Sequence, residues 1–452
     1  MSALHFTRAL TPEGWRSNVR LTIEGAWITA VEPDAAPDAR DERHPLGLPA
    51  IANLHSHAFQ RAMAGLTETR GAANDSFWTW RETMYRFALR MTPDDVEAVA
   101  AQLYVEMLES GFGAVAEFHY LHNSPDGAPY AARAEMAARI ASAAREAGIG
   151  LTLLPVFYAH STFGGAPPRA EQRRFVNDLE SFSRLLEDCR ALMKGEESGI
   201  VGVAPHSLRA TTPEELTALA AMAGEGLIHI HVAEQIKEVE DCLAWVGARP
   251  VRWLLDHASV NSRWCLVHAT HMDEREALDM AKSEAVAGLC PITEANLGDG
   301  TFGAVPYLGA GGRFGIGSDS NIEIGVAAEL RLLEYSQRLN ARSRNVCARP
   351  GESTGRALFE AAAAGGAQAL ARKCGRLAVG SIADIVSLRS DSPFLVQRDD
   401  NQILDTWIFA AGNRLVDCVW SSGRKVVAEG RHLRGAGIAD RFVQAMQRLG
   451  DL

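Results

Sequence analysis

The chain has 452 residues, of which 47% are hydrophobic and 22% charged, a composition typical of a folded globular enzyme. The formal net charge of -11 argues against nucleic acid or an anionic membrane as a partner, because both attract an excess of basic side chains. The seven cysteines are scattered without a Cys-x-x-Cys pair, and no run is apolar for long enough to span a membrane or to act as a signal peptide. We therefore expect reduced thiols in a cytoplasmic protein.

Residues 1–47 contain short alternating strands, such as 18–23, and a longer alternating region follows them. Between residues 48 and 375, short apolar runs alternate with helical patterns, and two helices begin with clear capping signals at Thr92-Pro93 and Thr212-Pro213. The apolar runs predicted to be strands are 48–54, 114–119, 150–156, 200–205, 227–232, 264–269, 286–291 and 313–318. Eight such units predict a (β/α)8 barrel, with a doubly wound open sheet as the alternative.

The last part of the chain is again rich in short strands. Residues 376–432 contain alternating segments such as 415–420, and a helix is expected from about Ile438. Two strand-rich pieces that flank a barrel combine most simply into one small domain. We therefore predict an α/β fold with a barrel at 48–375, a composite β-sandwich domain from 1–47 plus 376–432, and a C-terminal helix within 433–452.

Two histidines, His55 and His57, directly follow the first predicted strand. Residues two apart in a strand point to the same side, so both imidazoles can bind one metal ion. A His-x-His motif alone is a weak signal, because two solvent-exposed polar residues at a strand end give the same pattern.

Polar residues also stand at the carboxyl ends of other predicted strands, where barrel enzymes carry their catalytic groups. They are His119, Tyr120, His122, His206, His229, His231, His268 and Asp319. His231 is preferred to His229 as a ligand because the later residue of a strand end lies closer to the barrel mouth. His55, His57, His231 and Asp319 are thus the predicted ligands, and His229 is expected to line the site.

Three or more nitrogen and oxygen ligands with an open position are typical of a catalytic metal site. Zinc is the first choice, with iron or manganese as alternatives, and one ion per chain is expected because the fourth strand offers no lysine for a bridging carbamate. Such a metal lowers the pKa of bound water from about 15.7 towards about 7. Asp319 and His268 are candidates to take the proton of this water, and Glu234 to carry it to a leaving group. A purely structural role at a helix N-terminus is the alternative for Glu234.

The segment from Asn53 to Leu66, Asn-Leu-His-Ser-His-Ala-Phe-Gln-Arg-Ala-Met-Ala-Gly-Leu, resembles the formimidoylglutamate deiminase family of the amidohydrolase superfamily. Segments 229–235, 290–300 and 317–323 support the resemblance, and only Ile292 replaces an expected polar residue. The resemblance implies bound zinc, usually a homodimer, and the hydrolysis of N-formimino-L-glutamate to N-formyl-L-glutamate and ammonia in histidine degradation.

A substrate with two carboxylates needs cations in its pocket, although the protein as a whole is acidic. Arg209, at the rim of the fourth strand, is the first candidate to bind a carboxylate. Arg81 is the second, with a surface ion pair to Glu82 or Glu68 as its alternative. Candidates for hydrogen bonds to the substrate are Gln60, Tyr120 and His206.

Two other functions remain open. Another deaminase of the same superfamily, acting on a purine or pterin ring, would favour aromatic stacking over two arginines. A non-catalytic scaffold would be expected to lose metal ligands, and none is lost. The segment Gly298–Gly303 matches G-x-G-x-x-G, but no capped helix follows it, so we expect a flexible loop at the rim instead of a dinucleotide site.

Overall fold

The computed structural model describes residues 2–71, 75–196 and 199–450, and within them eight parallel strand positions form a barrel. The strands are β5 (Ile51–Ser56), β6 (Phe112–His119), β7 (Gly150–Phe157), β8 (Ile200–Val201) with β9 (Ala204–Pro205), β10 (Ile228–Val232), β11 (Trp264–His268), β12 (Val286–Leu289) and β13 (Arg313–Ile316). Parallel pairing runs from β5 to β8 and from β10 to β13. Bridges between Val203 and Ile228 and between Ser56 and Asp319 join the two groups and close the ring. The barrel prediction is confirmed, and the open-sheet alternative is wrong.

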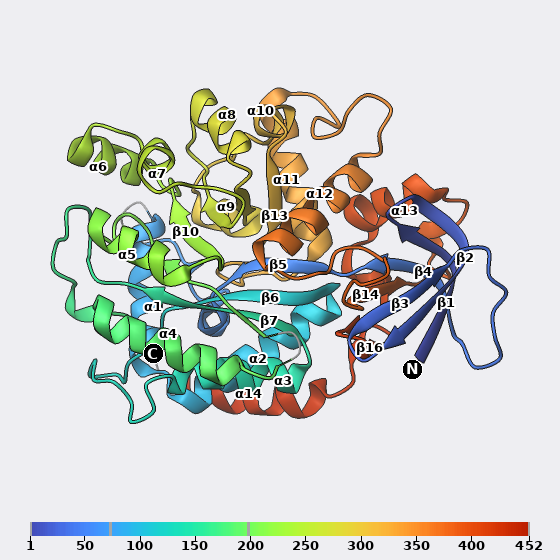
Figure 1. Cartoon of the computed structure of the whole chain (residues 1–452), viewed down its shortest axis with the longest axis horizontal. Coiled ribbons are helices and arrows are strands. Elements are labelled where there is room, and N and C mark those ends of the chain that lie inside the picture. The colour runs from blue at the N-terminus through green and yellow to red at the C-terminus, as the bar shows by residue number, and fades with distance from the viewer. Residues whose placement is uncertain (1, 72–74, 197–198, 451–452) are drawn as a thin grey trace.

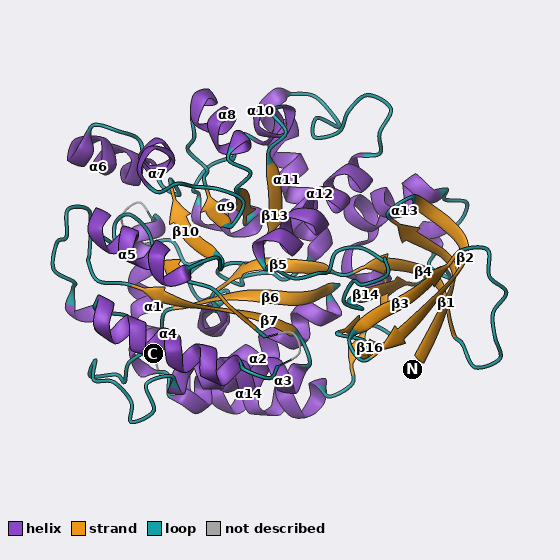
Figure 2. Cartoon of the chain, viewed as in Figure 1, coloured by secondary structure: helices purple, strands orange, loops and turns teal. Residues whose placement is uncertain are grey.

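The helices lie on the outside of these strands (Figure 2). Their bounds are α1 (Phe77–Arg90), α2 (Pro93–Glu109), α3 (Glu135–Ala147), α4 (Leu179–Met193), α5 (Pro213–Ala223), α6 (Ile236–Val246), α7 (Pro250–His257), α8 (Glu274–Lys282), α9 (Pro291–Leu297), α10 (Ala304–Gly309), α11 (Val326–Ala341), α12 (Thr354–Ala369), α13 (Asp400–Thr406) and α14 (Gly435–Leu449). The caps predicted at Thr92 and Thr212 are present, since each side-chain oxygen accepts from the third helical backbone N–H. None of the described helices has the length and apolar character needed to cross a membrane.

Strands from both ends of the chain form one further sheet beside the barrel (Figure 1). Its order is β17-β16-β15-β14-β4-β1-β2-β3. The strands are β1 (Ser2–Thr11), β2 (Gly14–Glu24), β3 (Trp27–Glu32), β4 (Glu42–Pro49), β14 (Ile385–Leu388), β15 (Val416–Ser421), β16 (Arg424–Ala428) and β17 (Arg431–His432). The sheet curls until Trp27 of its edge strand meets Ile382, and it buries its own core around Phe6 and Trp420. The small β-rich domain is thus one continuous curled sheet.

The predicted first barrel strand, 48–54, is divided between the two sheets. Leu48 and Pro49 belong to β4 and pair with Val386 and Ile385 of β14, whereas β5 of the barrel begins at Ile51. An apolar run has no local mark where the chain passes between two buried sheets, so the sequence pattern placed the start of the strand too early.

Candidate active site

The side chains of His55, His57, His231 and Asp319, here called the ligand cluster, converge at the carboxyl ends of β5, β10 and β13. His55 Nε2 lies 3.1 Å from His57 Nε2 and 3.0 Å from His231 Nε2. Asp319 Oδ1 lies 3.3 Å from His55 Nε2 and 3.2 Å from His57 Nε2. All four side chains are buried. The structure therefore brings together the residues that the sequence analysis proposed as ligands.

Carbonyl groups orient two of the imidazole rings. His57 Nδ1 lies 2.9 Å from the carbonyl oxygen of Phe118, and His231 Nδ1 lies 3.0 Å from that of His206. A carbonyl oxygen only accepts, so both Nδ1 atoms carry hydrogen and both Nε2 atoms turn a lone pair towards the cluster. Burial lowers the pKa of His55 to about 3 and that of His231 well below its usual value, which keeps the rings neutral, as metal binding requires.

The ligand cluster fits a divalent metal ion. Four atoms placed about 2.0–2.1 Å from one ion at tetrahedral corners lie about 3.3 Å from one another, close to the spacings within the cluster. Three imidazole nitrogens and one carboxylate oxygen also form a donor set that zinc and related ions accept. Without a cation, several lone pairs would face each other in a buried space at a considerable energetic cost.

Asp319 divides its two oxygens between the ligand cluster and His268. Its Oδ1 faces the histidine ligands, and its Oδ2 lies 3.8 Å from His268 Nε2. Glu294 holds the other side of the His268 ring, with Oε1 3.4 Å from Nδ1. Burial lowers the pKa of His268, but Glu234, Glu294 and Asp319 more than offset this effect and bring the pKa to about 10. Both Asp319 and His268 have left-handed backbone angles, with φ of 45° and 67°, a form of strain found at functional sites.

Glu234 lies between His268 and Arg209. Its Oε1 is 3.8 Å from His268 Nε2, and its Oε2 is 3.5 Å from Arg209 Nη2. Burial raises the pKa of Glu234, while His268 and Arg209 oppose this rise. Behind it, the buried carboxylate of Glu238 accepts from the backbone N–H groups of Ala233 and Glu234. Glu234 is therefore a buried acid on a fixed turn next to the ligand cluster, more than a helix-terminal charge.

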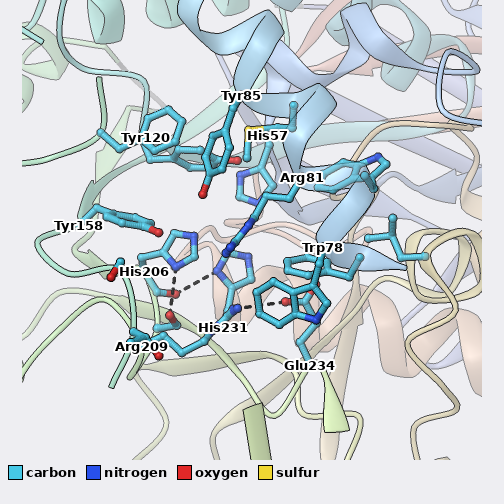
Figure 3. Close-up of a pocket in the computed structure, with 18 of the residues that line it drawn as sticks. His57, Trp78, Arg81, Tyr85, Tyr120, Tyr158, His206, Arg209, His231 and Glu234 are labelled. Carbon is cyan, nitrogen blue, oxygen red and sulfur yellow. Dashed lines mark hydrogen bonds and ion pairs between the residues drawn. The ribbon is translucent and has the colours of Figure 1, made fainter. Parts of the chain in front are cut away.

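A cavity of about 510 Å³ opens from the ligand cluster and contains the side chains proposed to bind substrate (Figure 3). It is lined by Gln60, Arg81, Tyr120, His206, Arg209 and Glu234, together with His57, His231 and Asp319 of the ligand cluster. Burial lowers the pKa of Arg209, but Glu238 and Glu234 more than offset this, so the guanidinium stays charged although its exposed fraction is only 8%. The interior of this acidic protein thus contains a fixed positive charge.

Arg81 borders the same cavity from α1 and rests on aromatic rings. Its guanidinium carbon lies 4.6 Å from the centre of the Trp78 ring and 5.6 Å from that of Tyr85. The alternative ion pair with Glu82 or Glu68 is absent, since no carboxylate within the described ranges pairs with Arg81, and Glu68 accepts instead from Asn296. Arg81 therefore offers a cation to the cavity without an acidic partner of its own.

Several polar residues that the sequence analysis placed at the rim face other parts of the protein. His229 Nε2 bonds to the carbonyl of Ala369 at the end of α12, so it packs the barrel interior away from the ligand cluster. His122 bonds to the carbonyl of Val156, and His119 lies against His122. These histidines are absent from the described cavity wall. Position at a strand end predicts the rim, but whether a side chain reaches the cavity depends on its depth along the strand and on its direction.

The segment Gly298–Gly303 follows a helix, α9, and not a strand, which excludes a dinucleotide-binding turn. It is also better anchored than the expected flexible loop. Asp299 is buried, its carboxylate accepts from the Gln235 amide, and His271 bonds to its carbonyl oxygen.

The aromatic wall of the cavity was not predicted from the sequence. Phe77, Trp78, Tyr85, Tyr158 and Phe175 line it beside Tyr120. Tyr158 directly follows β7, so its place at a strand end was a usable signal. The other four come from a helix and a loop whose path the local pattern does not reveal.

The comparisons with known proteins agree with this geometry. The amidohydrolase family model matches residues 47–426, and a model described as the N-terminal domain of formimidoylglutamate deiminase HutF matches residues 1–45. A formimidoylglutamate deiminase of Pseudomonas aeruginosa is 51% identical, with 100% of each chain covered. A 5-methylthioadenosine/S-adenosylhomocysteine deaminase of Natronomonas pharaonis is 28% identical, covering 88% of this chain and 87% of its own. The crystal structure of an amidohydrolase from Brucella melitensis superposes with a TM-score of 0.96 at 54% identity, covering 99% of this chain and 100% of the other.

Proposed function

The chain belongs to the amidohydrolase family, and we infer that its reaction is the hydrolytic deimination of N-formimino-L-glutamate to N-formyl-L-glutamate and ammonia. The observation that carries this inference is a cavity with the ligand cluster at one end and two guanidinium groups, Arg81 and Arg209, on its wall. A substrate with two carboxylates and a hydrolysable C–N bond matches both features.

We propose one zinc ion per chain, held by His55, His57, His231 and Asp319, with iron or manganese as ions that the same donors accept. When bound, the metal would supply Lewis acidity, which lowers the pKa of a water molecule so that hydroxide is available as a nucleophile near neutral pH. The protein residues around it position the substrate and move the protons.

Deimination requires one proton to leave the attacking water and another to reach the nitrogen that departs as ammonia. Asp319 Oδ2 is placed to accept and hold the first proton, and His268, whose raised pKa favours the charged imidazolium, faces this oxygen through Nε2 and fixes its position. Glu234 is placed to give a proton to the leaving nitrogen, because its raised pKa favours the protonated form and its carboxyl borders the cavity. The formimino nitrogen takes one proton from Glu234 as the water attacks and the proton held at Asp319 as the C–N bond breaks, so that it leaves as ammonia. The hydroxyl on the tetrahedral carbon returns its proton to Glu234 as the formyl C=O forms.

The substrate is proposed to lie along the cavity, with its formimino carbon at the ligand cluster and its carboxylates at Arg209 and Arg81. Tyr120 and Gln60 border the inner part, where Gln60 Nε2 donates to Tyr120 Oη at 2.7 Å. The phenol of Tyr120 then keeps its own hydrogen for a substrate atom. His206 adds a partly exposed imidazole on the same side.

The competing substrate is an aminated ring of the purine or pterin type, which the aromatic wall of the cavity would stack against. Ammonia release by purified, zinc-loaded protein separates the two candidates when N-formimino-L-glutamate is compared with a panel of aminated heterocycles. We expect kcat/KM for the diacid to exceed that for every ring by at least about 100-fold, because only the diacid pairs with both arginines. Faster ammonia release from a heterocycle would overturn the substrate assignment.

We further propose a homodimer in the cytoplasm that acts in histidine degradation. The family resemblance supports the dimer and the pathway, and the seven free cysteines, six of them buried, are compatible with a reducing compartment. Sedimentation of the purified protein tests the dimer directly.

A further inference from the structure

A buried amide, that of Gln172, joins two tyrosines of the cavity wall. Gln172 Nε2 lies 2.7 Å from Tyr158 Oη and 3.1 Å from Tyr85 Oη, and the glutamine side chain has no solvent exposure. Tyr85 comes from α1, Tyr158 follows β7, and Gln172 ends the short turn Ala170–Gln172. Three segments distant in the sequence thus meet at one amide group.

The orientation of this amide follows from its other contact. The backbone N–H of Arg169 lies 2.8 Å from Gln172 Oε1. A backbone N–H only donates, so the atom that faces it is the carbonyl oxygen, and the NH2 group faces the two phenols. Both phenol oxygens therefore accept a hydrogen bond from Gln172. Each tyrosine keeps its own O–H hydrogen to donate elsewhere.

The cavity is where these hydrogens are directed. Tyr85 and Tyr158 both border it, and in the described part of the chain no carboxylate or carbonyl oxygen accepts from either hydroxyl. The two hydroxyl groups also lie within hydrogen-bond range of each other, and when one donates to the other, the second O–H remains for a ligand. Figure 3 shows the two hydroxyl groups turned towards the middle of the cavity, where Arg81 lies.

Arg81 and Arg209 both lie close to the hydroxyl group of Tyr158. Burial raises the pKa of Tyr158, while Arg81 and Arg209 oppose the rise, so both guanidinium groups lie within electrostatic range of its hydroxyl. Arg81 also stands over the ring of Tyr85. Two O–H donors beside two cations form a site for an anion with more than one acceptor oxygen, such as a carboxylate.

Ring contacts show how far this site lies from the ligand cluster. Tyr120 contacts the ligand His57 directly, with ring centres 4.9 Å apart. Tyr158 contacts His206, 4.7 Å away, and Tyr85 contacts Phe175, 6.0 Å away. Among the described ring pairs neither tyrosine contacts a histidine of the ligand cluster, so both rings stand at least one ring farther from the cluster than Tyr120, where a distal group of the substrate can reach them.

We propose that Gln172 orients Tyr85 and Tyr158 as a donor pair for the substrate carboxylate farther from the reacting carbon. Gln172 is then a positioning residue, and the two phenols are binding residues that act together with the arginines. The identity of the substrate in this inference rests on the proposed function, whereas the site for a distal carboxylate rests on the hydrogen-bond directions.

The sharpest test reverses the direction of these hydrogen bonds with almost no change of shape. In Gln172→Glu the ionised side chain only accepts, so it draws both phenol hydrogens away from the cavity. We expect KM for N-formimino-L-glutamate to rise at least about tenfold while kcat changes less than about threefold. The kcat/KM for N-formimino-L-norvaline, whose side chain ends in a methyl group, should change little. The preference for the diacid, as a ratio of the two kcat/KM values, should therefore fall about tenfold.

The variant Tyr85→Phe/Tyr158→Phe provides the matched test, because it keeps both rings and removes both O–H donors. It should reproduce the loss of preference with normal metal content and a thermal midpoint close to that of the wild type. If Gln172→Glu does not fold, the double variant by itself tests whether the two phenols bind the distal carboxylate. An unchanged preference for the diacid in this double variant would overturn the proposal.

Glutarate binding, measured by calorimetry, separates failure of this proposal from failure of the proposed function, because it needs no turnover. Glutarate should bind the wild type and bind the double phenylalanine variant at least about fivefold more weakly. If the wild type does not deiminate N-formimino-L-glutamate but this loss of glutarate binding is seen, the proposed function falls and the phenol pair stands. Equal binding to both proteins, or none to the wild type, refutes the phenol pair.

Discussion

Arg209 Nη2 lies 3.5 Å from Glu234 Oε2, so the cation proposed to bind the substrate also contacts the acid proposed to transfer a proton. Arg209 lowers the pKa of Glu234 against the rise that burial causes. We therefore expect substrate binding and proton transfer to be electrostatically coupled through this pair. A carboxylate that binds Arg209 adds negative charge near Glu234 and favours its protonated form, which is the form that a proton donor needs.

Replacement of Arg209 by methionine should affect both steps. A charged hydrogen bond to a buried carboxylate is worth roughly 1.5–3 kcal/mol, so kcat/KM for N-formimino-L-glutamate should fall more than about tenfold. Because Glu234 loses its neighbour, kcat should change as well as KM. Arg81→Met should raise mainly KM, since Arg81 has no contact with Glu234. Steady-state kinetics check both variants, with the exposed Arg86→Met on the same helix as control. A change of less than about threefold for Arg209→Met would show that it does not bind a carboxylate.

Metal content should depend on the ligand cluster. The purified protein should contain about one zinc ion per chain, and His55→Ala or Asp319→Ala should lose most of it, because each removes one of few buried donors. Elemental analysis measures this directly. His160→Asn is the control, since His160 pairs with Glu215 outside the cluster. Two ions per chain, or full retention in both alanine variants, would refute the single-ion site.

Glu234→Gln should separate chemistry from binding. The amide cannot transfer a proton, so kcat should fall by about 100-fold or more, while zinc content and KM stay near those of the wild type. His268→Asn should behave similarly, because it removes the imidazole that faces and positions Asp319 Oδ2. Glu240→Gln, exposed on the neighbouring helix, is the control. Near-normal turnover by Glu234→Gln would show that Glu234 does not transfer the proton and has only a structural role at the helix N-terminus.

Acid should weaken the contact between α2 and α14. Asp95 accepts from the N–H and hydroxyl of Thr92, and its Oδ1 lies 2.6 Å from Arg448 Nη2. Burial raises the pKa of Asp95, but these partners more than offset it, so its pKa in the folded protein lies below the usual value. This stabilisation is complete above the unfolded pKa of about 3.9 and is lost as pH falls through the folded pKa.

Asp95→Asn should therefore lower the free energy of unfolding by about 1 kcal/mol near neutral pH. The gap between its thermal midpoint and that of the wild type should narrow as the pH falls below about 4. Scanning calorimetry across this range checks the expectation, with the exposed neighbour Asp94→Asn as control. A gap that stays constant with pH would exclude the ionised form of Asp95 as its source.

Local patterns were sufficient to predict much of the fold. Each barrel strand has the apolar run expected of a strand buried on both faces, and the caps at Thr92 and Thr212 depend only on nearby residues. The ligand cluster was also accessible, because the carboxyl ends of parallel barrel strands meet at one rim. The sequence pattern did not show that Leu48 and Pro49 belong to a different sheet from the rest of their apolar run, because both sheets bury such residues equally well.

The sequence by itself determined which segments become strands and helices and which residues reach the barrel rim, because hydrophobic period and capping act over a few neighbouring residues. Only the tertiary structure decided which rim side chains share a cavity. Tyr120 and His122 both follow β6, yet Tyr120 lines the cavity and His122 bonds to the carbonyl of Val156. Gln172 reaches Tyr85 across 87 positions of sequence. Such contacts depend on how strands rotate and loops return, and these are set by packing of the whole chain.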